Sequence, residues 1–580
     1  MSAVPTEPRW WLGPPPVCRL DEAVDAVVEP GMHLHFSSTP SRSNAAILAI
    51  AARFQRTDPG FTLSSTGFHS VAHLLGRLRL GRRYIASFFG DNHPTPRPSR
   101  LYTTLTEEGA ALEVWSLGAL VSALRAGALG LPGALTRSLV GSTLGEDLAA
   151  AGRLQWTADG EAALLAPMRP DVTFLHGLVA DRDGNVLFSA PRCEGSWAAL
   201  GAREGAIVTV ERIVEGDLCE RFPESIALPA HRIRAICVAP RGASPQPLPA
   251  MPAAGIKGYS DVTDGYAFWR ALASDDALWD EFSAAVLDEP DVHAAAAAFI
   301  ARPRPRPRPR QLPPELPESP PVMRLALAAR WIAERVREGG YPVILAGIGQ
   351  SFLASRAAAL QLAREGRRVL IMVETGLYDV SADDSDGYLL SYQNFGVSRR
   401  LSDVEDTLLT LTCGADSRCL GVIGVGQLDP RGDINSTRIG GRFLVGSGGA
   451  NDIASSAAEV IALAPLRSDR LVAQVEHITS PGRRLLSVVT ERGVLCRSET
   501  STDRWWVEQA FRPQGLSAVL DACWPGHIEE IRATAAPLSS AERALILTLD
   551  PEGVHWNTKE QTWWSPSRSL ESATTSRRAS

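Results

Sequence analysis

The stretch YPVILAGIGQSFLASRAAALQLAREGRRVLIMVETG, residues 341–376, decides the fold class of this chain. Val343–Ala346 and Val369–Val373 are short apolar runs, and Leu353–Ala363 between them places apolar side chains at helical spacing. A strand, a helix and a second strand of these lengths make parallel neighbours that a right-handed crossover joins. The stretch therefore predicts an α/β fold with a parallel sheet.

The first half of the chain opens with the same order of elements. A helix, a strand, a helix and a strand are predicted there, over Leu20–Val27, Met32–Phe36, Asn44–Phe54 and Phe61–Ser64. In the second half, a helix from Leu325 to Val336 precedes the stretch quoted above. Further along, Val172–His176 and Cys419–Ile423 are apolar runs, and each leads into a turn with Asp and Gly. The order predicts two related open twisted-sheet domains in tandem, and the alternative is a chance likeness between two common α/β openings.

A run that alternates Arg and Pro, residues 302–310, separates the two halves. Proline fixes φ and removes an amide donor, so the run is expected to be a polyproline II spacer outside any helix or sheet. A docking peptide for an aromatic groove is the less favoured alternative. The expected divisions are an N-terminal tail (1–16), a first domain (17–300), the Arg/Pro-rich linker (301–321), a second domain (322–555) and a disordered tail (556–580).

Composition narrows the class of protein. The chain has 580 residues and a net charge of −7, which argues against nucleic acid as a main partner. No apolar stretch has the length of a membrane helix, and the eight cysteines form no CxxC pair. We therefore expect a reduced, cytoplasmic protein with no structural metal, no membrane partner and no permanently bound cofactor, and a homo-oligomer stays open.

Glu374 is the most informative single position. It ends an apolar strand, and ligands of open parallel sheets bind at the carboxyl ends of strands. Gly347 and Gly349 end the preceding strand, so they are expected at the same edge, where glycine allows close approach of the backbone to a ligand. A carboxylate beside such a crevice can act as a nucleophile. The first half has Ser65 at the matching place, so one site between the halves is expected; the alternative is a solvated or capping glutamate.

The run GSGGAND, residues 446–452, is a second candidate. Consecutive small residues expose backbone N–H groups, and the predicted helix over Ile453–Leu463 would add partial positive charge at its start. Such a loop suits a phosphate or the oxyanion of an attacked thioester. No Gly-Lys-Ser/Thr follows, so it is not a Walker loop. The alternative is an ordinary loop with an Asn or Asp N-cap.

These motifs together resemble family I CoA-transferases, most closely the glutaconate CoA-transferase type. The runs GVGQLDPRGDINST (424–437), GSGGANDIA (446–454) and ITSPG (478–482) look like the β-subunit of that type. Gly184-Asn185 and residues 197–213 resemble its α-subunit. The chain thus looks like an α–β fusion through the proline linker.

The resemblance implies a role for each matched residue. Glu374 matches the nucleophilic glutamate, with Thr375 where the family has Ser or Asn. The oxyanion and CoA-binding residues it implies, together with the glycines of the first strand end, are Gly448, Gly449, Ala450, Gly347, Gly349, Gln427 and Asn451. It implies a ping-pong transfer of CoA from an acyl-CoA to a carboxylic acid through a glutamyl-CoA thioester. An acyl-CoA hydrolase or decarboxylase, or a non-catalytic acyl-CoA-binding protein, are the alternatives.

The first half departs from the resemblance at its first strand. Where many α-subunits have a glycine-rich loop, this chain has HFSSTP, residues 35–40, which leaves the acyl group open. His33 and His35 point to one face of the strand. A metal would need further ligands that the sequence does not offer, so packing or substrate contact is favoured for both.

Overall fold

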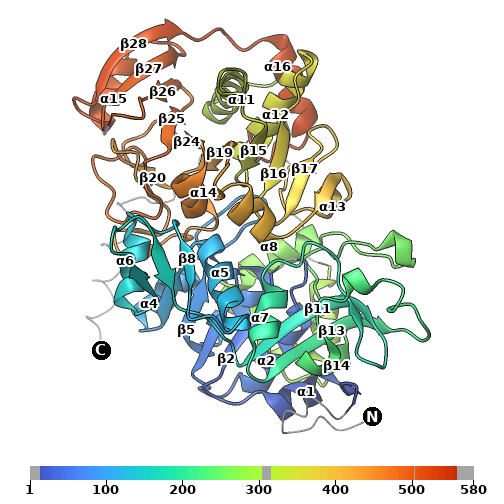
Figure 1. Ribbon diagram of the computed structural model, residues 1–580. Helices are drawn as coiled ribbons and strands as arrows, with labels where there is room; N and C mark the ends of the chain where they lie inside the picture. The colour runs from blue at the N-terminus through green and yellow to red at the C-terminus, as the bar shows by residue number, and fades with distance from the viewer. Residues whose placement is uncertain (1–12, 39, 304–311, 313–314, 502, 558–580) are drawn as a thin grey trace, which may run out of the picture.

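The computed structural model describes residues 13–38, 40–303, 312, 315–501 and 503–557. It consists of two α/β halves, each built on a large sheet (Figure 1). The Arg-Pro run from residue 304 and the predicted tail from residue 558 lie outside the described residues, as do residues 1–12 of the predicted N-terminal tail. The divisions predicted between tails, domains and linker stay predictions.

The sheet of the first half has nine strands, and all neighbours along its main path are parallel. Its order is β1 (Val17–Cys18), β14 (Ile233–Val238), β13 (Gly205–Ile213), β11 (Val172–Ala180), β2 (His33–Phe36), β3 (Phe61–Ser64), β5 (Gly81–Ala86) and β7 (Ala111–Val114). The ninth strand, β12 (Val186–Leu187), pairs antiparallel with β11.

The sheet of the second half has ten strands with a parallel centre. Its order is β18 (Ser398–Leu401), β17 (Leu377–Val380), β16 (Leu370–Val373), β15 (Val343–Ala346), β19 (Cys419–Gly424), β24 (Glu459–Leu463), β25 (Leu485–Val489), β26 (Gly493–Cys496), β27 (Trp505–Ala510) and β28 (Ile528–Thr534). The run β14-β13-β11-β2-β3 of the first sheet has the same order as β25-β24-β19-β15-β16 of the second. The predicted α/β fold with related sheets is confirmed.

Helices cover the sheets and supply the crossovers (Figure 1). In the first half they are α1 (Leu20–Val27), α2 (Asn44–Phe54), α3 (His73–Arg77), α4 (Arg100–Glu107), α5 (Leu117–Ala128), α6 (Thr143–Ala150), α7 (Gly195–Gly201), α8 (Thr263–Leu272), α9 (Asp276–Val286) and α10 (Val292–Ile300). In the second half they are α11 (Pro320–Gly339), α12 (Gln350–Arg364), α13 (Tyr392–Gly396), α14 (Ala450–Ser456), α15 (Leu516–Cys523) and α16 (Ser540–Leu549). The short strands β8 (Ala134–Thr136), β10 (Ala163–Leu165) and β9 (Leu154–Trp156) form a small separate sheet.

Two predicted boundaries are wrong. Residues 453–463 were expected as one helix, but α14 ends at Ser456 and residues 459–463 form β24, buried between β19 and β25. Periodicity does not separate a fully buried strand from a buried helix. Pro320 and Pro321, assigned to the linker, form the first turn of α11. The first-turn amides of a helix have no partner within the helix, so proline is tolerated there.

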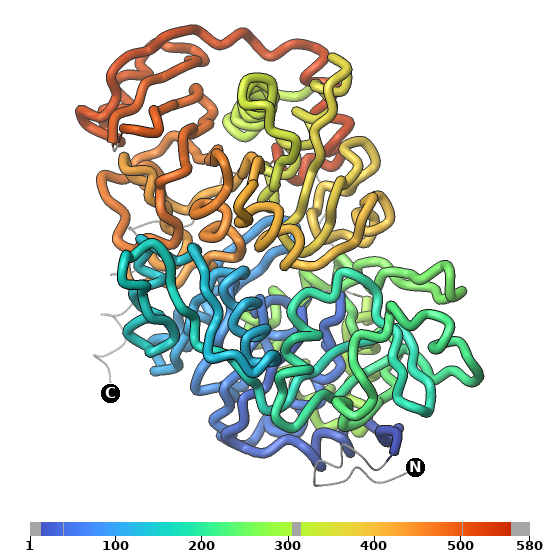
Figure 2. The backbone as a smooth tube through the Cα atoms, viewed as in Figure 1, coloured from blue at the N-terminus to red at the C-terminus, as the bar shows by residue number. Residues whose placement is uncertain are grey.

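The two halves pack closely along one boundary, as the backbone trace shows (Figure 2). Leu117 and Val121 on α5 belong to one apolar cluster with Leu408 and Ile453 of the second half. Hydrogen bonds cross the same boundary: Asp452 accepts from the Ser116 hydroxyl at 2.8 Å and from the Gly118 amide at 2.9 Å. Burial of apolar surface and of these polar groups fixes the relative position of the halves.

None of the described helices combines the length and the apolar character that crossing a membrane requires.

Candidate active site

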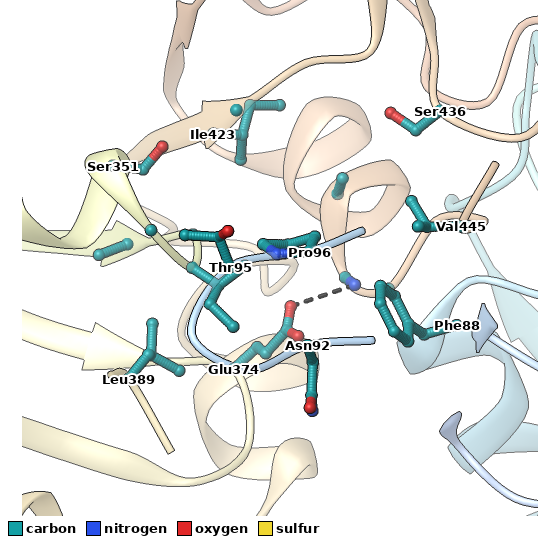
Figure 3. Close-up of a pocket in the computed structure, with 18 of the residues that line it drawn as sticks. Phe88, Asn92, Thr95, Pro96, Ser351, Glu374, Leu389, Ile423, Ser436 and Val445 are labelled. Carbon is teal, nitrogen blue, oxygen red and sulfur yellow. Dashed lines mark hydrogen bonds between the residues drawn. The ribbon is translucent and has the colours of Figure 1, made fainter. Parts of the chain in front are cut away.

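A cavity of about 1290 Å³ lies between the two halves, and both supply its walls. Residues from the first half include Ser38, Thr66, Asn92, Thr95, Cys193 and Glu194, and those from the second include Gly347, Gly349, Glu374, Gly448, Gly449 and Arg467. Glu374 lies below the loop that carries Thr95 and Pro96, and Phe88 and Val445 stand to one side (Figure 3). Such a large, partly apolar cleft at the carboxyl ends of parallel strands is a ligand site by position.

Glu374 follows β16 and is half-buried in this cavity. Its Oε2 accepts a hydrogen bond from the Gly449 N–H at 3.1 Å (Figure 3), and its backbone oxygen accepts one from the Thr407 hydroxyl at 3.0 Å. Removal from water and the nearby negative charge of Asp452 raise the pKa of Glu374 to about 7, against the opposing effect of the Gly449 N–H. A carboxylate with this pKa, held in a cleft, is typical of a functional group.

The glycine loop reaches Glu374 because the first half holds it. Gly448 has a φ of +53°, which favours glycine, and its N–H donates to the Ser87 oxygen while its own oxygen accepts from the Leu117 N–H, both at 2.9 Å. The Ala450 N–H donates to the Ser447 oxygen at 3.0 Å. Of the three predicted amide donors, Gly449 is therefore the one that offers its N–H to the carboxylate, and the expectation for the other two is corrected.

Gly349 and Gly347 lie where the sequence places them, in the cavity wall after β15. Gly349 has a φ of +86° at the start of α12, and a Cβ there would lie 3.4 Å from the Thr95 Cγ2 atom of the first half. The Gly347 N–H donates to the Val422 oxygen at 2.8 Å. Side-chain atoms at these positions would narrow the wall, so glycine keeps the backbone accessible to a ligand.

Gln427 and Asn451 do not line the cavity, which corrects the expectation that both are cleft residues. Gln427 accepts from the Asn435 amide at 3.2 Å within its own half. Asn451 accepts from the Leu139 N–H at 2.8 Å and donates to the Thr479 oxygen at 2.9 Å. Both side chains join segments of the fold, because a place in a glycine-rich motif does not determine where a neighbouring side chain points.

His33 and His35 both contact the Ser64 hydroxyl, at 2.7 and 2.9 Å. This agrees with their predicted position on one face of the strand. Among the described residues, no group of three or more His, Cys, Asp or Glu side chains is arranged to hold a metal ion.

Sequence reasoning missed two groups of cavity residues. Ser38, Thr66 and Glu194 come from three separate segments of the first half, and no local pattern marks them. Arg324, Arg467 and Arg470 give the second half a basic wall. Arg467 and Arg470 come soon after β24, so the rule that ligands bind at strand carboxyl ends could have found them.

We expect the raised pKa of Glu374 to lower the stability of the protein at alkaline pH. Between pH 4.5 and about 7, the unfolded chain ionises this carboxyl group while the folded protein keeps it protonated, so stability falls through this range. Glu374→Gln removes the effect and should make the protein more stable at pH 8 by roughly 1–3 kcal/mol. The two proteins should have equal stability at pH 4. Thermal and urea unfolding at both pH values measure this, and a wild type as stable as the variant at pH 8 would contradict it.

Asp452→Asn should shift the titration of Glu374 to lower pH. The substitution removes the negative charge that raises the pKa of Glu374, and asparagine can still accept from the Gly118 amide. We expect the pH midpoint of Glu374 to fall by about 0.5–1 unit. Carboxyl infrared absorption or the pH dependence of Glu374 labelling reports it. Glu405→Gln is the matched control at the same boundary, since Glu405 bonds to Trp197 and is not a cause of the Glu374 shift; an unmoved midpoint in Asp452→Asn contradicts the assignment.

Comparisons with known proteins agree with this fold. Residues 17–239 match the model of the coenzyme A transferase family. One of the two chains of a 3-oxoadipate CoA-transferase from Pseudomonas knackmussii (strain DSM 6978 / CCUG 54928 / LMG 23759 / B13) is 39% identical over 127 residues, which is 22% of this chain. The chain spans 44% of the length of that curated relative. The resemblance to CoA-transferases is thus confirmed for residues 17–239, while the glutaconate type and the fusion of two subunit-like halves stay predictions.

Solved structures share the fold over nearly the whole chain. The acyl-CoA transferase YdiF from Escherichia coli O157:H7, in a thioester complex with CoA, superposes with a TM-score of 0.62 at 14% identity and covers 90% of this chain and 96% of its own. A protein assigned as the alpha subunit of citrate lyase from Streptococcus mutans, in complex with citrate, has a TM-score of 0.50 at 13% identity over 96% of this chain and 88% of its own. At these identities the likeness concerns the fold.

Proposed function

We propose that this protein is a CoA-transferase, which moves CoA from an acyl-CoA to a carboxylic acid with Glu374 as the nucleophile. The single observation that carries the proposal is the Glu374 carboxylate, which faces a glycine N–H at 3.1 Å in a cavity between the halves. The family match over residues 17–239 and the shared fold of the acyl-CoA transferase support it. A cytoplasmic location and a homo-oligomeric state stay predictions.

The proposed reaction has two symmetrical halves. The Glu374 carboxylate attacks the thioester carbonyl, the carbon–sulfur bond breaks, and a mixed anhydride and CoA thiolate form. The thiolate then attacks the glutamyl carbonyl, which releases the donor acid and leaves CoA on Glu374 as a thioester. An acceptor carboxylate reverses these steps and departs as the new acyl-CoA. Glu374 ends unchanged, so no oxidant or metal is consumed.

The Gly449 N–H supports both oxyanions of this sequence. It is fixed at the start of α14, and it already contacts the carboxylate that becomes the carbonyl under attack. One preorganised donor of this kind contributes about 3 kcal/mol to transition-state stabilisation. The raised pKa of Glu374, about 7, leaves a substantial ionised fraction at neutral pH and gives a better nucleophile than an ordinary carboxylate.

The basic wall of the second half suits the phosphates of CoA. Arg324, Arg467 and Arg470 line the cavity together with the backbone at Gly347–Gln350. Arg470 donates to the Gly426 oxygen at 2.8 Å, and Arg467 pairs with Asp469 at 2.6 Å, so both side chains are held in place. Guanidinium groups bind phosphate through charge-assisted hydrogen bonds, and binding energy from this remote part of the substrate can drive the reaction at Glu374.

Dependence on an acceptor acid tests the function. The protein is mixed with acetyl-CoA and a panel of isotopically labelled short-chain acids, and new acyl-CoA is measured by mass spectrometry. A transferase produces labelled acyl-CoA only when an acid is present, whereas a hydrolase releases free CoA at the same rate without it. Loss of CO₂ from a malonyl-type thioester would support a decarboxylase instead. Binding of acyl-CoA with no turnover across the panel would indicate a non-catalytic binding protein and overturn the proposal.

A further inference from the structure

The first half contains a counterpart of the corner that holds Glu374. Before α7, Cys193 has a φ of +50° and Glu194 is the N-cap with φ −85° and ψ −13°. Before α14, Gly448 has a φ of +53° and Gly449 is the N-cap with φ −86° and ψ 1°. The backbone thus follows one path in both halves. The carboxylate has moved: the strand end carries Ser65 in place of glutamate, and the N-cap carries Glu194 in place of glycine.

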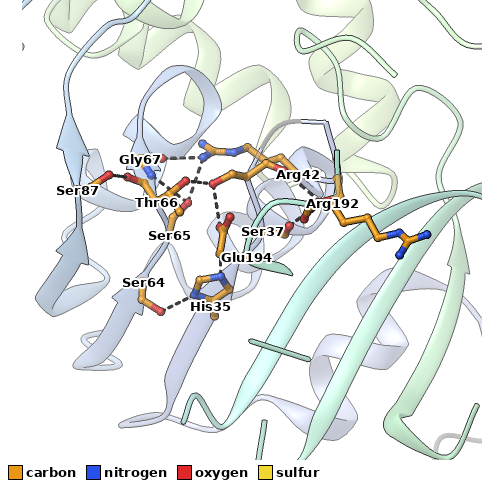
Figure 4. A network of polar contacts seen from close by, with 12 residues as sticks. His35, Ser37, Arg42, Ser64, Ser65, Thr66, Gly67, Ser87, Arg192 and Glu194 are labelled. Atoms are coloured by element: carbon orange, nitrogen blue, oxygen red, sulfur yellow. Dashed lines mark hydrogen bonds and ion pairs between the residues drawn. The ribbon is translucent and has the colours of Figure 1, made fainter. Parts of the chain in front are cut away.

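Glu194 is fully buried, yet it forms part of the cavity wall. Its Oε1 accepts from the Ser38 hydroxyl at 2.8 Å and lies 3.4 Å from the His35 Nε2 atom. Ser38 also contacts the Thr66 hydroxyl. Figure 4 shows the carboxylate between the ring of His35 and the segment after β3. Its Oε2 has no hydrogen-bond partner among the described residues, which is costly for a buried carboxylate unless a ligand supplies a donor.

This region, which we call the polar wall, consists of Ser38, Thr66, His69, Cys193 and Glu194. It adjoins the nucleophile, since the Cys193 sulfur lies 3.8 Å from the Thr375 oxygen. The basic wall of Arg324, Arg467 and Arg470 belongs to the other half. If CoA phosphates occupy the basic wall, the acyl group of a thioester at Glu374 extends toward the polar wall.

The charges around Glu194 favour a neutral hydrogen-bond donor in the ligand. Burial lowers the pKa of His69 well below its ordinary value, so this ring carries no charge at neutral pH. Arg42 is fully buried and donates to the Ser65 hydroxyl at 3.0 Å and the Gly67 oxygen at 2.7 Å. Its positive charge interacts with Glu194, but its side chain does not line the cavity. The polar wall therefore lacks a cation for a second substrate carboxylate, while Arg42 disfavours a substrate ammonium group.

Resting on the proposed transferase function, we propose that Glu194 selects acyl groups that carry a hydroxyl, which donates to the unpartnered Oε2 atom, and disfavours acyl groups that carry a second carboxylate. A hydrogen bond to a buried charged acceptor corresponds to a preference of about 10- to 100-fold over the acid that lacks the hydroxyl. A buried carboxylate opposite Glu194 meets a like charge without a partner, so a dicarboxylic acid is rejected.

The test compares four-carbon acids as acceptors for the full-length protein. Butyrate, 3-hydroxybutyrate, 4-hydroxybutyrate, 4-aminobutyrate and succinate are assayed with one acyl-CoA donor, and kcat/KM is measured for each. The wild type should prefer one hydroxy acid over butyrate by about 10- to 100-fold. Glu194→Gln should reduce this preference and Glu194→Met should remove it, and both should improve succinate. Glu211→Gln, at another buried Glu–His contact of the first half outside the cavity, is the matched control and should keep the wild-type order.

The outcomes separate this proposal from the function on which it rests. Equal use of butyrate and both hydroxy acids, or an unchanged preference in Glu194→Met, overturns the role of Glu194 while transfer stands. Preference for 4-aminobutyrate or succinate also overturns it. If no acid accepts CoA, the transferase function fails, and the order of the acids is then read from the thermal shifts they cause in the wild type, Glu194→Gln and Glu211→Gln. Circular dichroism shows that each variant is folded.

Discussion

Incubated with an acyl-CoA and no acceptor acid, the protein should accumulate CoA on Glu374 as a glutamyl thioester. Glu374 is the carboxylate that faces the Gly449 N–H inside the cavity, and no water is needed to form this adduct. Mass spectrometry should place the added mass on the peptide that contains Val373-Glu374-Thr375. Borohydride should reduce the thioester and inactivate the protein, because the reduced side chain is no longer a nucleophile.

Glu374→Ala and Glu374→Gln should each lower transfer by about 10⁴-fold or more, since either substitution removes the nucleophile. Glutamine keeps an oxygen that can accept from the Gly449 N–H, so this variant should still bind acyl-CoA. Glu405→Gln serves as the control for loss of a carboxylate near the same boundary and should keep the adduct. Full activity of Glu374→Ala with the true substrates would falsify the mechanism.

Gly449→Ala should lower turnover by about 100-fold or more. A methyl group at this position would lie 2.1 Å from the Glu374 Oε2 atom and 3.1 Å from its Cδ atom, so the carboxylate must leave its place. The backbone at Gly449 has a φ of −86°, which alanine adopts without strain. Stability should therefore fall by only about 1 kcal/mol, the cost of a poorer N-cap. Steady-state kinetics and thermal unfolding of the same preparation measure both effects.

Gly396→Ala is the matched control for this substitution. Gly396 ends α13, has no positive φ, and a Cβ there would meet nothing within 4 Å. This variant should keep both turnover and stability. If Gly449→Ala turns over at the same rate as Gly396→Ala, Gly449 has no part in positioning Glu374 or its oxyanion.

Short-range patterns were sufficient for most of the fold. The bounds of α1, α2, β3 and β15 agree with the prediction residue by residue. Each is an apolar run or an amphipathic segment with a clear stop, such as the cap that Ser43 gives α2. Helical spacing and strand length are local properties, so one sequence reveals them. The same patterns failed at residues 459–463, where burial on both faces of β24 removes any period that distinguishes strand from helix.

The candidate site was predicted in part. Glu374, Gly347 and Gly349 follow strands whose carboxyl ends meet at one edge, and the structure brings all three to one cavity. Gln427 and Asn451 share motifs with cavity residues, but their side chains face the interior of the fold. Motif membership identifies a segment and not the direction of each side chain, which depends on the elements packed around it.

The sequence by itself determined the α/β class, the related openings of the two halves and the strand end that carries Glu374. Only the tertiary structure decided which groups surround that carboxylate. Gly448 is held by Ser87 and Leu117, more than 300 positions earlier in the chain, and this contact sets the Gly449 N–H against Glu374. Glu194 meets His35 and Ser38 only because α7 packs against β11, the neighbour of β2 in the sheet. Local patterns follow from the chain's own dihedral and solvation preferences, whereas these contacts follow from the packing of whole sheets and from the cost of leaving buried polar groups without partners.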